Sequence, residues 1–212
     1  MFPDEMLKRL ADSKVVAGFS IENVDHAVPL AKALLAGGID VIELTLRTDA
    51  GLEAVKAISA AVPEVLLGVG TILTHEQAHA VKAAGGHFGV APGMNPRVIR
   101  AAIEAGLPFG PGIATPSELE ISIELGCRFV KFFPAEAAGG IKYLKSISTP
   151  YKHLGIQYFP LGGLNAENMH DYLKEDNVPC IGGSWIVQQD LVDQEDWAGI
   201  TARAKSVTDA LK

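Results

Sequence analysis

The feature that most constrains the fold is a unit that repeats along the whole chain. In each unit an amphipathic stretch ends in glycine, and a short β-branched or aromatic run follows it. The clearest joints are Ala36-Gly37-Gly38-Ile39, Ala84-Gly85-Gly86-His87, Ala105-Gly106-Leu107 and Leu125-Gly126-Cys127. A glycine just past a helix commonly takes the left-handed conformation that ends the helix. Each joint therefore predicts the end of a helix and the start of a strand.

Between these joints the sequence predicts eight strands, each followed by a helix, and an extra helix over residues 3–12. The strands are expected at residues 14–19, 39–45, 65–70, 88–91, 107–111, 128–133, 155–160 and 179–182. Eight βα units at a spacing of about 20–25 residues favour an α/β fold, a closed (β/α)8 TIM barrel that takes in residues 1–212 as one domain. The competing fold is an open doubly wound sheet, whose first turn is typically rich in glycine. The first turn here, residues 19–23, has no glycine.

Charge and cysteine content narrow the class of protein. The formal net charge is −7 and there is no basic stripe, so neither nucleic acid nor an anionic membrane is expected as a partner. Cys127 and Cys180 are far apart and each opens a predicted strand, which indicates small buried residues rather than a disulfide framework. No apolar run approaches the ~20 residues of a membrane span, and no signal peptide is apparent. We therefore expect a cytoplasmic protein.

One lysine lies inside a short apolar run. The run is Arg128-Phe129-Val130-Lys131-Phe132-Phe133-Pro134, which is typical of a buried strand. Burial disfavours the charged ammonium, and a partly neutral amine is a nucleophile whose usual reaction is a Schiff base with a carbonyl substrate. The alternatives are a structural Lys131 paired with one carboxylate, or a strand end that reaches solvent.

The second predicted strand carries polar side chains on one face. Its alternation places Glu43, Thr45 and Arg47 together, facing into the predicted barrel, with apolar residues on the other face. A glutamate inside a barrel needs a partner or a chemical role. One interpretation is a Glu43–Arg47 salt bridge. The functional interpretation makes Glu43 a proton shuttle beside Lys131, and Arg47 a planar clamp for a substrate carboxylate.

Glycines follow several predicted strands at the end where a barrel carries its active site. The third strand ends Gly68-Val69-Gly70-Thr71, where glycine allows a ligand close to the backbone and the Thr71 hydroxyl is placed to bind a carboxylate oxygen. The fourth ends Ala91-Pro92-Gly93, which is expected to wall the pocket. The last two end at Gly162-Gly163 and Gly182-Gly183-Ser184. Paired glycines there are typical of a barrel phosphate site, where backbone N–H groups hold the anion.

The histidines show no convincing metal-ligand spacing. His75 and His79 are four residues apart on one predicted helix, but that helix is expected to face outward. The sequence therefore predicts neither a metal nor a cofactor.

Four segments resemble the 2-keto-3-deoxy-6-phosphogluconate / 4-hydroxy-2-oxoglutarate aldolase family. They are residues 42–48 (IELTLRT), 68–71 (GVGT), 131–136 (KFFPAE) and 182–185 (GGSW). The resemblance covers essentially the whole chain and implies a (β/α)8 barrel, a homotrimer, and metal-free class I cleavage of a phosphorylated keto acid to pyruvate and an aldehyde. It implies that Lys131 forms the Schiff base and Glu43 is the acid/base. The substrate-binding residues it implies are Arg47 and Thr71 for the carboxylate, Pro92 and Phe133 for the wall, and Gly162, Gly163 and Ser184, beside Gly183, for the phosphate.

Two departures from the family pattern concern the aldehyde half of the substrate. Many relatives read Thr-Gly-Gly where this chain has Leu161-Gly162-Gly163, and some have arginine where it has Ser20. The preferred prediction is cleavage of a 2-keto-3-deoxy-6-phospho sugar acid to pyruvate and glyceraldehyde 3-phosphate. The alternatives are an aldolase of another 2-keto acid (4-hydroxy-2-oxoglutarate or an unphosphorylated acid), a barrel that binds a phosphorylated acid without turnover, and a phosphosugar epimerase.

Overall fold

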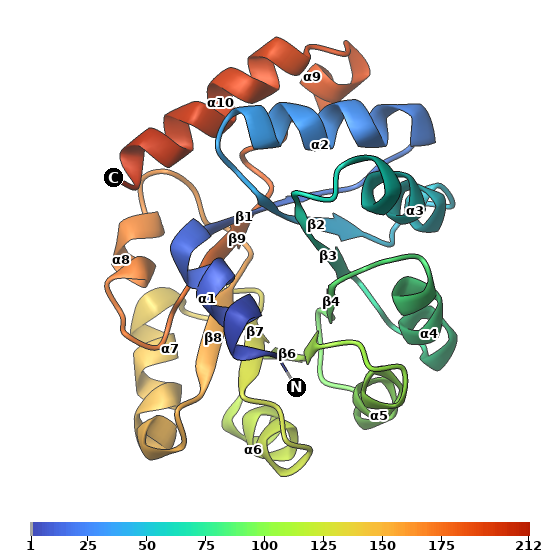
Figure 1. Ribbon diagram of the computed structural model, residues 1–212. Coiled ribbons are helices and arrows are strands. Elements are labelled where there is room, and N and C mark those ends of the chain that lie inside the picture. Colours follow the sequence, from blue (N-terminus) through green and yellow to red (C-terminus); the bar gives the residue numbers. More distant parts are fainter. Residues whose placement is uncertain (1) are drawn as a thin grey trace.

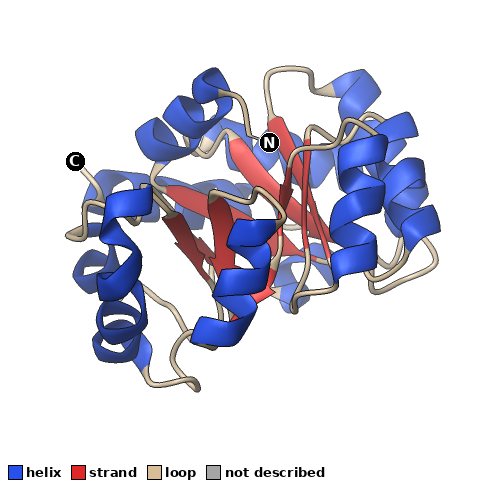
Figure 2. Ribbon diagram, turned by 90° about the horizontal axis from the view of Figure 1, so that it is seen from below, coloured by secondary structure: helices blue, strands red, loops and turns tan. Residues whose placement is uncertain are grey.

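The computed structural model describes residues 2–212 and has parallel strands in two sheets surrounded by helices (Figures 1 and 2). The larger sheet has six strands in the order β5-β4-β3-β2-β1-β9, and the smaller has three in the order β6-β7-β8. The strands are β1 (Val15–Phe19), β2 (Val41–Thr45), β3 (Leu66–Gly70), β4 (Phe88–Val90), β5 (Phe109–Gly110), β6 (Gly112–Ile113), β7 (Phe129–Phe132), β8 (Gln157–Pro160) and β9 (Ile181–Gly183).

Helices follow the strands in sequence and lie on the outside of the sheets (Figure 2). They are α1 (Asp4–Ser13), η1 (Val24–His26), α2 (Ala27–Ala36), α3 (Gly51–Ala61), α4 (His75–Ala83), α5 (Pro96–Glu104), α6 (Pro116–Glu124), α7 (Gly140–Ser148), η2 (Thr149–Leu154), α8 (Met169–Leu173), α9 (Gln189–Asp193) and α10 (Trp197–Ala210). Among residues 2–212, no helix is long and apolar enough to cross a membrane.

The expectation of a closed eight-stranded barrel is wrong. Within residues 2–212 the strands form two separate sheets of six and three, and neither closes on itself. The predicted strand at 107–111 ends early and a new strand begins after Pro111, so β5 and β6 belong to different sheets. Proline has no N–H to continue a ladder. The N–H of Gly112 donates instead to the carbonyl of Gly93, at 3.3 Å.

The other break lies between β8 and β9, which belong to different sheets. Side chains fill this junction. A Cβ at Gly182 of β9 would lie 2.6 Å from Cδ2 of Leu161 and 2.9 Å from Cζ of Phe159. Packing across a glycine therefore joins the two strands where the predicted barrel would have a hydrogen-bonded ladder. The remaining order of elements agrees with the sequence, since each predicted strand range contains strand residues and α1 covers most of the range 3–12.

An apolar cluster fills one end of the space between the two sheets. It includes buried Val16, Phe88, Phe129 and Phe159, and Leu10 of α1 covers it from outside the strands. Buried polar residues are few among those described: Glu43, Thr45, Ser122, Lys131 and Ser148. Three of them, Glu43, Thr45 and Lys131, line one cavity. The interior is therefore apolar at the N-terminal ends of the strands and polar at the C-terminal ends.

Candidate active site

A cavity of about 470 Å³ opens at the C-terminal ends of the strands. Its walls come from β1, β2, β7 and β9, from the segments that follow β8 and β9, and from the start of α9. Of the residues predicted from the sequence, the cavity brings together Lys131, Glu43, Arg47, Phe133, Gly162, Gly183 and Ser184. The predicted residues at the ends of two strands of the larger sheet and two of the smaller sheet thus converge on a single space.

Lys131 and Glu43 form a buried ion pair at this cavity. Nζ of Lys131 lies 3.0 Å from Oε1 of Glu43, and the two side chains are 5% and 1% exposed. Glu43 comes from β2 of the larger sheet and Lys131 from the central strand of the smaller one, so the pair spans the two sheets. Two charges taken out of water are retained only with close, hydrogen-bonded geometry. The salt bridge considered between Glu43 and Arg47 is not among the ion pairs of residues 2–212.

Glycine at position 70 makes room for this carboxylate. A Cβ at Gly70 would lie 2.0 Å from Oε1 of Glu43, a separation that no real pair of atoms tolerates. Gly18 on the other side is more open, since its Cβ would lie 3.9 Å from Oε2. From the sequence, the glycines of β3 are expected to allow a ligand close to the backbone. Here the absent side chain of Gly70 is required by the position of Glu43.

Phe133 and Thr45 complete the walls around the lysine. The Phe133 ring centroid is 5.3 Å from Nζ of Lys131, close enough for a cation–π contact. Thr45 donates to the carbonyl of Phe19 at 3.2 Å, and its hydroxyl lies 2.6 Å from that of Ser20. The hydroxyls of Ser20 and Thr45 therefore engage each other at this part of the cavity.

Arg47 is placed to receive an anion. It follows β2 on an exposed segment and lines the cavity. Among residues 2–212 its guanidinium makes no salt bridge or hydrogen bond, so its planar donor face is available to a ligand.

The loops after β8 and β9 line the same cavity with Gly162 and Ser184, and Gly163 follows directly in the first of these loops. Gly162 has φ +98° and Gly163 has φ +84°, both in the left-handed region that favours glycine. Within the described residues, the N–H groups of Gly162, Gly163 and Ser184 donate to no protein acceptor. Unengaged N–H groups of this kind form a ready anion site.

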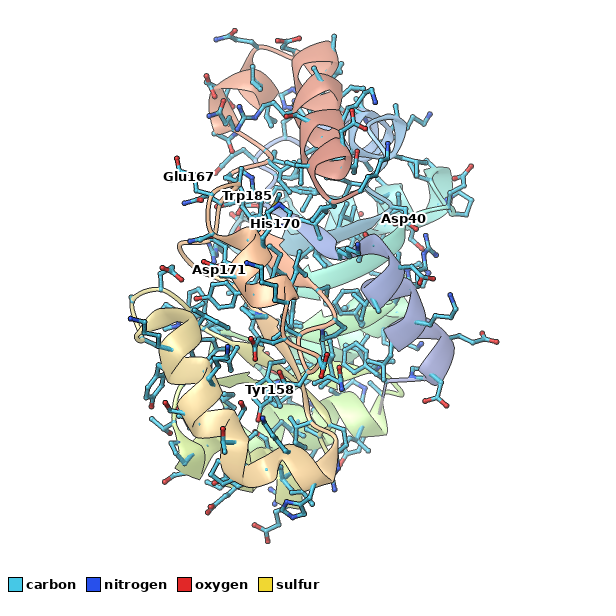
Figure 3. The ribbon with its side chains drawn as sticks, turned by 90° about the vertical axis from the view of Figure 1, so that its left-hand side faces the viewer. Asp40, Tyr158, Glu167, His170, Asp171 and Trp185 are labelled. Atoms are coloured by element: carbon cyan, nitrogen blue, oxygen red, sulfur yellow. The ribbon has the colours of Figure 1, made fainter. Side chains whose placement is uncertain are left out.

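Contacts behind these loops hold them in place. The carbonyl of Gly162 accepts from the N–H of Glu136 at 3.0 Å, and Tyr172 donates to the Glu136 carboxylate. Burial and this hydrogen bond raise the pKa of the Tyr172 hydroxyl. After β9, Arg203 of α10 donates to the carbonyl of Trp185, a residue that Figure 3 labels. The β8 loop is therefore supported from α8, and the β9 loop from α10.

Three predicted site residues lie outside the cavity lining. Thr71 is half-buried and has φ +61°, which is unusual for a residue other than glycine. Pro92 backs onto Gly112, whose Cβ would lie 2.3 Å from the Pro92 carbonyl. Gly163 packs closely on Glu136, since a Cβ at position 163 would lie 2.7 Å from the Cβ of Glu136.

Comparison with known proteins identifies the class. The family described as "Aldolase: KDPG and KHG aldolase" matches residues 6–203. The KHG/KDPG aldolase of Escherichia coli strain K12 is 41% identical over 203 residues, which is 96% of this chain and 94% of that protein.

This chain belongs to the KDPG and KHG aldolase family.

Solved structures of similar proteins agree with that assignment. The KDPG aldolase of Legionella pneumophila, with pyruvate captured at low pH as a covalent carbinolamine intermediate, superposes with a TM-score of 0.89 at 40% identity. The alignment covers 93% of this chain and 95% of that one. The Zymomonas mobilis ZM4 enzyme with 3-phosphoglycerate gives a TM-score of 0.87 at 35% identity, over 96% and 93% of the two chains. The prediction of an aldolase of this family is confirmed.

Sequence reasoning missed two polar residues of this aldolase's cavity. Ser20 was treated only as a departure from the family, and Gln189 at the start of α9 was not considered. The Ser20–Thr45 contact depends on the register that sets Gly18 opposite Glu43, so the tip of β1 faces the end of β2. No pattern in the sequence indicates Gln189, because a loop of irregular structure separates it from the end of β9.

Proposed function

We propose that this aldolase reversibly cleaves 2-keto-3-deoxy-6-phosphogluconate to pyruvate and glyceraldehyde 3-phosphate through a Schiff base on Lys131. The single observation that carries the proposal is the buried Lys131–Glu43 pair in a cavity that Gly162 and Ser184 also line. The proposal has support from the Legionella relative, which is described with pyruvate bound covalently. The Zymomonas relative is described with 3-phosphoglycerate, a phosphorylated three-carbon acid.

Formation of the imine begins at the 3.0 Å hydrogen bond between Lys131 and Glu43. Nζ loses a proton to the carboxylate and attacks the C2 carbonyl of the keto acid. The resulting carbinolamine loses its hydroxyl as water, with the proton supplied by Glu43, and leaves an iminium ion. The Phe133 ring, whose centroid is 5.3 Å from Nζ, packs beside the attacking amine.

Glu43 then serves as the base for carbon–carbon cleavage. Its carboxylate takes the C4 hydroxyl proton, the C3–C4 bond breaks, and the electron pair moves into the iminium to give an enamine. The aldehyde half departs. The enamine takes at C3 the proton that Glu43 holds, which gives an iminium again and restores the carboxylate, and water hydrolyses this iminium to release pyruvate and regenerate the Lys131 amine.

Binding of the two charged ends of the substrate is assigned to opposite sides of the cavity. Arg47 holds the carboxylate, which its free guanidinium and its position at the cavity favour. Thr71 and Pro92 contribute to the same end of the site, as the family resemblance implies. The distal phosphate binds at Gly162, Gly163, Gly183 and Ser184. The unengaged N–H groups there and the Ser184 hydroxyl supply donors without any lysine or arginine.

A second candidate substrate class is a short or unphosphorylated 2-keto acid, such as 4-hydroxy-2-oxoglutarate. Leu161 favours it, because this apolar side chain lines the cavity beside Gly162 and Gly182. Ser20 favours it as well, since its hydroxyl is already engaged with Thr45. A barrel that binds a phosphorylated acid without turnover is disfavoured, because the buried lysine–glutamate pair has no use in such a protein.

The experiment is a retro-aldol assay coupled to pyruvate detection. The substrates are 2-keto-3-deoxygluconate with and without its 6-phosphate, and 4-hydroxy-2-oxoglutarate, with Lys131→Arg as the inactive control. We expect the highest kcat/KM for the 6-phosphate. A higher kcat/KM for either unphosphorylated acid would instead support the second candidate substrate class. If none of the three substrates yields pyruvate, both candidate functions are contradicted.

Assembly and location follow as further proposals. A homotrimer agrees with the family resemblance and with exposed apolar side chains, of which Ile103 is 54% and Leu73 is 52% exposed. A cytoplasmic location agrees with Cys127 and Cys180, which are both free and buried. Sedimentation at micromolar concentration tests the trimer, and fractionation of the source cells tests the location.

A further inference from the structure

A group of three side chains with metal-binding donor atoms lies away from the cavity. We propose that His75, His79 and Glu104 form a site for a divalent transition-metal ion of the Zn²⁺ type, bridging α4 and α5. Their donor atoms all lie within 4.8 Å of one another. None of the three lines the active-site cavity, so this site is separate from the aldol chemistry.

Two of the donors share one helix face. His75 and His79 are the first and fifth residues of α4, and residues four apart in a helix are neighbours. Their ring centroids are 4.6 Å apart. The start of the helix is fixed by Thr74, which accepts from the N–H of Gln77 while the Gln77 side chain accepts from the Thr74 N–H. This capping box holds the backbone that carries both imidazoles.

The third donor comes from the neighbouring helix. Glu104 ends α5, which packs beside α4 (Figure 1). Its Oε2 lies 3.8 Å from Nε2 of His75. In a tetrahedral site with bonds of about 2.0–2.1 Å, two donors stand about 3.4 Å apart. The side chains of His75 and Glu104 are 56% and 64% exposed, so small rotations bring the donors to that spacing.

The donor set selects the class of ion. Two imidazole nitrogens and one carboxylate oxygen suit Zn²⁺, Ni²⁺, Co²⁺ or Cu²⁺, and water takes the open fourth position. Mg²⁺ and Ca²⁺ prefer oxygen ligands only. Because the ligands come from two helices, a bound ion ties α4 to α5 and favours the folded chain over the unfolded one.

The test is equilibrium dialysis of tag-free protein against ZnCl₂ and, in parallel, MgCl₂. We expect one Zn²⁺ per chain with saturable binding and no Mg²⁺ binding under the same conditions. His79→Ala and Glu104→Gln should each weaken Zn²⁺ binding at least tenfold. His153→Ala removes an exposed histidine far from the three in sequence and should leave binding unchanged. These side chains are exposed, so the variants are expected to fold, and circular dichroism checks this.

Thermal unfolding gives a second readout that does not depend on activity. Zn²⁺ at 100 times its dissociation constant should raise the Tm of the wild type by roughly 5 °C or more, and should not raise that of His79→Ala. Retro-aldol turnover should be the same with and without one equivalent of Zn²⁺. Zn²⁺ binding that is non-saturable, or that is undiminished in His79→Ala, would overturn the proposal.

Discussion

The amine of Lys131 lies 3.0 Å from the carboxylate of Glu43, and the two residues come from different sheets. In sequence they are 88 positions apart. The pair exists only because β2 and β7 face each other across the interior. In the proposed mechanism, this contact holds the nucleophile beside its acid/base before any substrate binds, which is the arrangement that a Schiff-base aldolase requires.

Removing the charge of the Glu43 carboxylate separates the role of Glu43 in proton transfer from its role in packing. Glu43→Gln keeps the size and one acceptor oxygen, so Lys131 keeps a hydrogen-bond partner. We expect kcat for retro-aldol cleavage to fall by roughly 10²–10⁴, the range for a positioned acid/base, while imine formation with pyruvate persists at a lower rate. Glu124→Gln, on the exposed side of α6, is the matched control. Nearly full activity in Glu43→Gln would assign the proton transfers to another group.

The absence of a side chain at Gly70 should be essential for retro-aldol activity. In Gly70→Ala the new methyl group falls 2.0 Å from Oε1 of Glu43 and displaces the carboxylate from Lys131. We expect a loss of kcat comparable to that of Glu43→Gln. Gly93→Ala is the matched control, because a Cβ there meets nothing within 4 Å. Equal kcat in the two glycine variants, measured side by side, would mean that the carboxylate position is not critical.

The phosphate preference should depend on the loops after β8 and β9. Ser184→Ala should lower the ratio of kcat/KM for phosphorylated to plain substrate by roughly 10- to 150-fold, which corresponds to about 1.5–3 kcal/mol for one hydrogen bond to a charged group. Gly163→Val should reduce it more, because its side chain meets Glu136 and its φ of +84° is strained for valine. Ser146→Ala, on an exposed turn of α7, is the control. An unchanged ratio in both loop variants would remove these loops from phosphate binding.

The cysteines should be inert in the folded protein. Burial raises the pKa of Cys127 from 9.0 to about 11, and burial also raises the pKa of Cys180. At pH 8 the thiolate fraction of Cys127 is then about a hundredfold below that of a free thiol, so alkylation by iodoacetamide should slow by at least that factor. Labelling in guanidinium is the control.

The raised pKa of Cys127 also predicts that the free energy of unfolding declines as pH rises from 9 toward 11, because the Cys127 thiol loses its proton at lower pH in the unfolded chain than in the folded one.

Much of the fold could be predicted from local signals, and the failures have physical causes. Glycine joints and capping residues such as Thr74 depend on neighbouring residues only, so they located the elements correctly. The break between the two sheets at Pro111 could not be predicted, because a proline commonly follows a strand without dividing a sheet. Whether it divides one depends on which neighbouring strand would have paired there.

Parts of the site that depend on tertiary contacts could not be predicted. Strand alternation predicts that Glu43 lies on the inner face of its strand, and the structure places it with Lys131 at one cavity. The role of Gly70 depends on the rotamer of a residue in the next strand. Glu104 approaches His75 only through the packing of α4 on α5, and no spacing in the sequence indicates it.

The central claim is that Lys131 is the nucleophile. The most direct measurement is incubation with pyruvate and sodium borohydride, followed by intact-mass analysis and peptide mapping. We predict one reduced pyruvate adduct per chain, located on Lys131, and none in Lys131→Arg, which should fold but stay charged and form no imine. An adduct on another lysine, or no adduct in a protein that is active, would contradict the account.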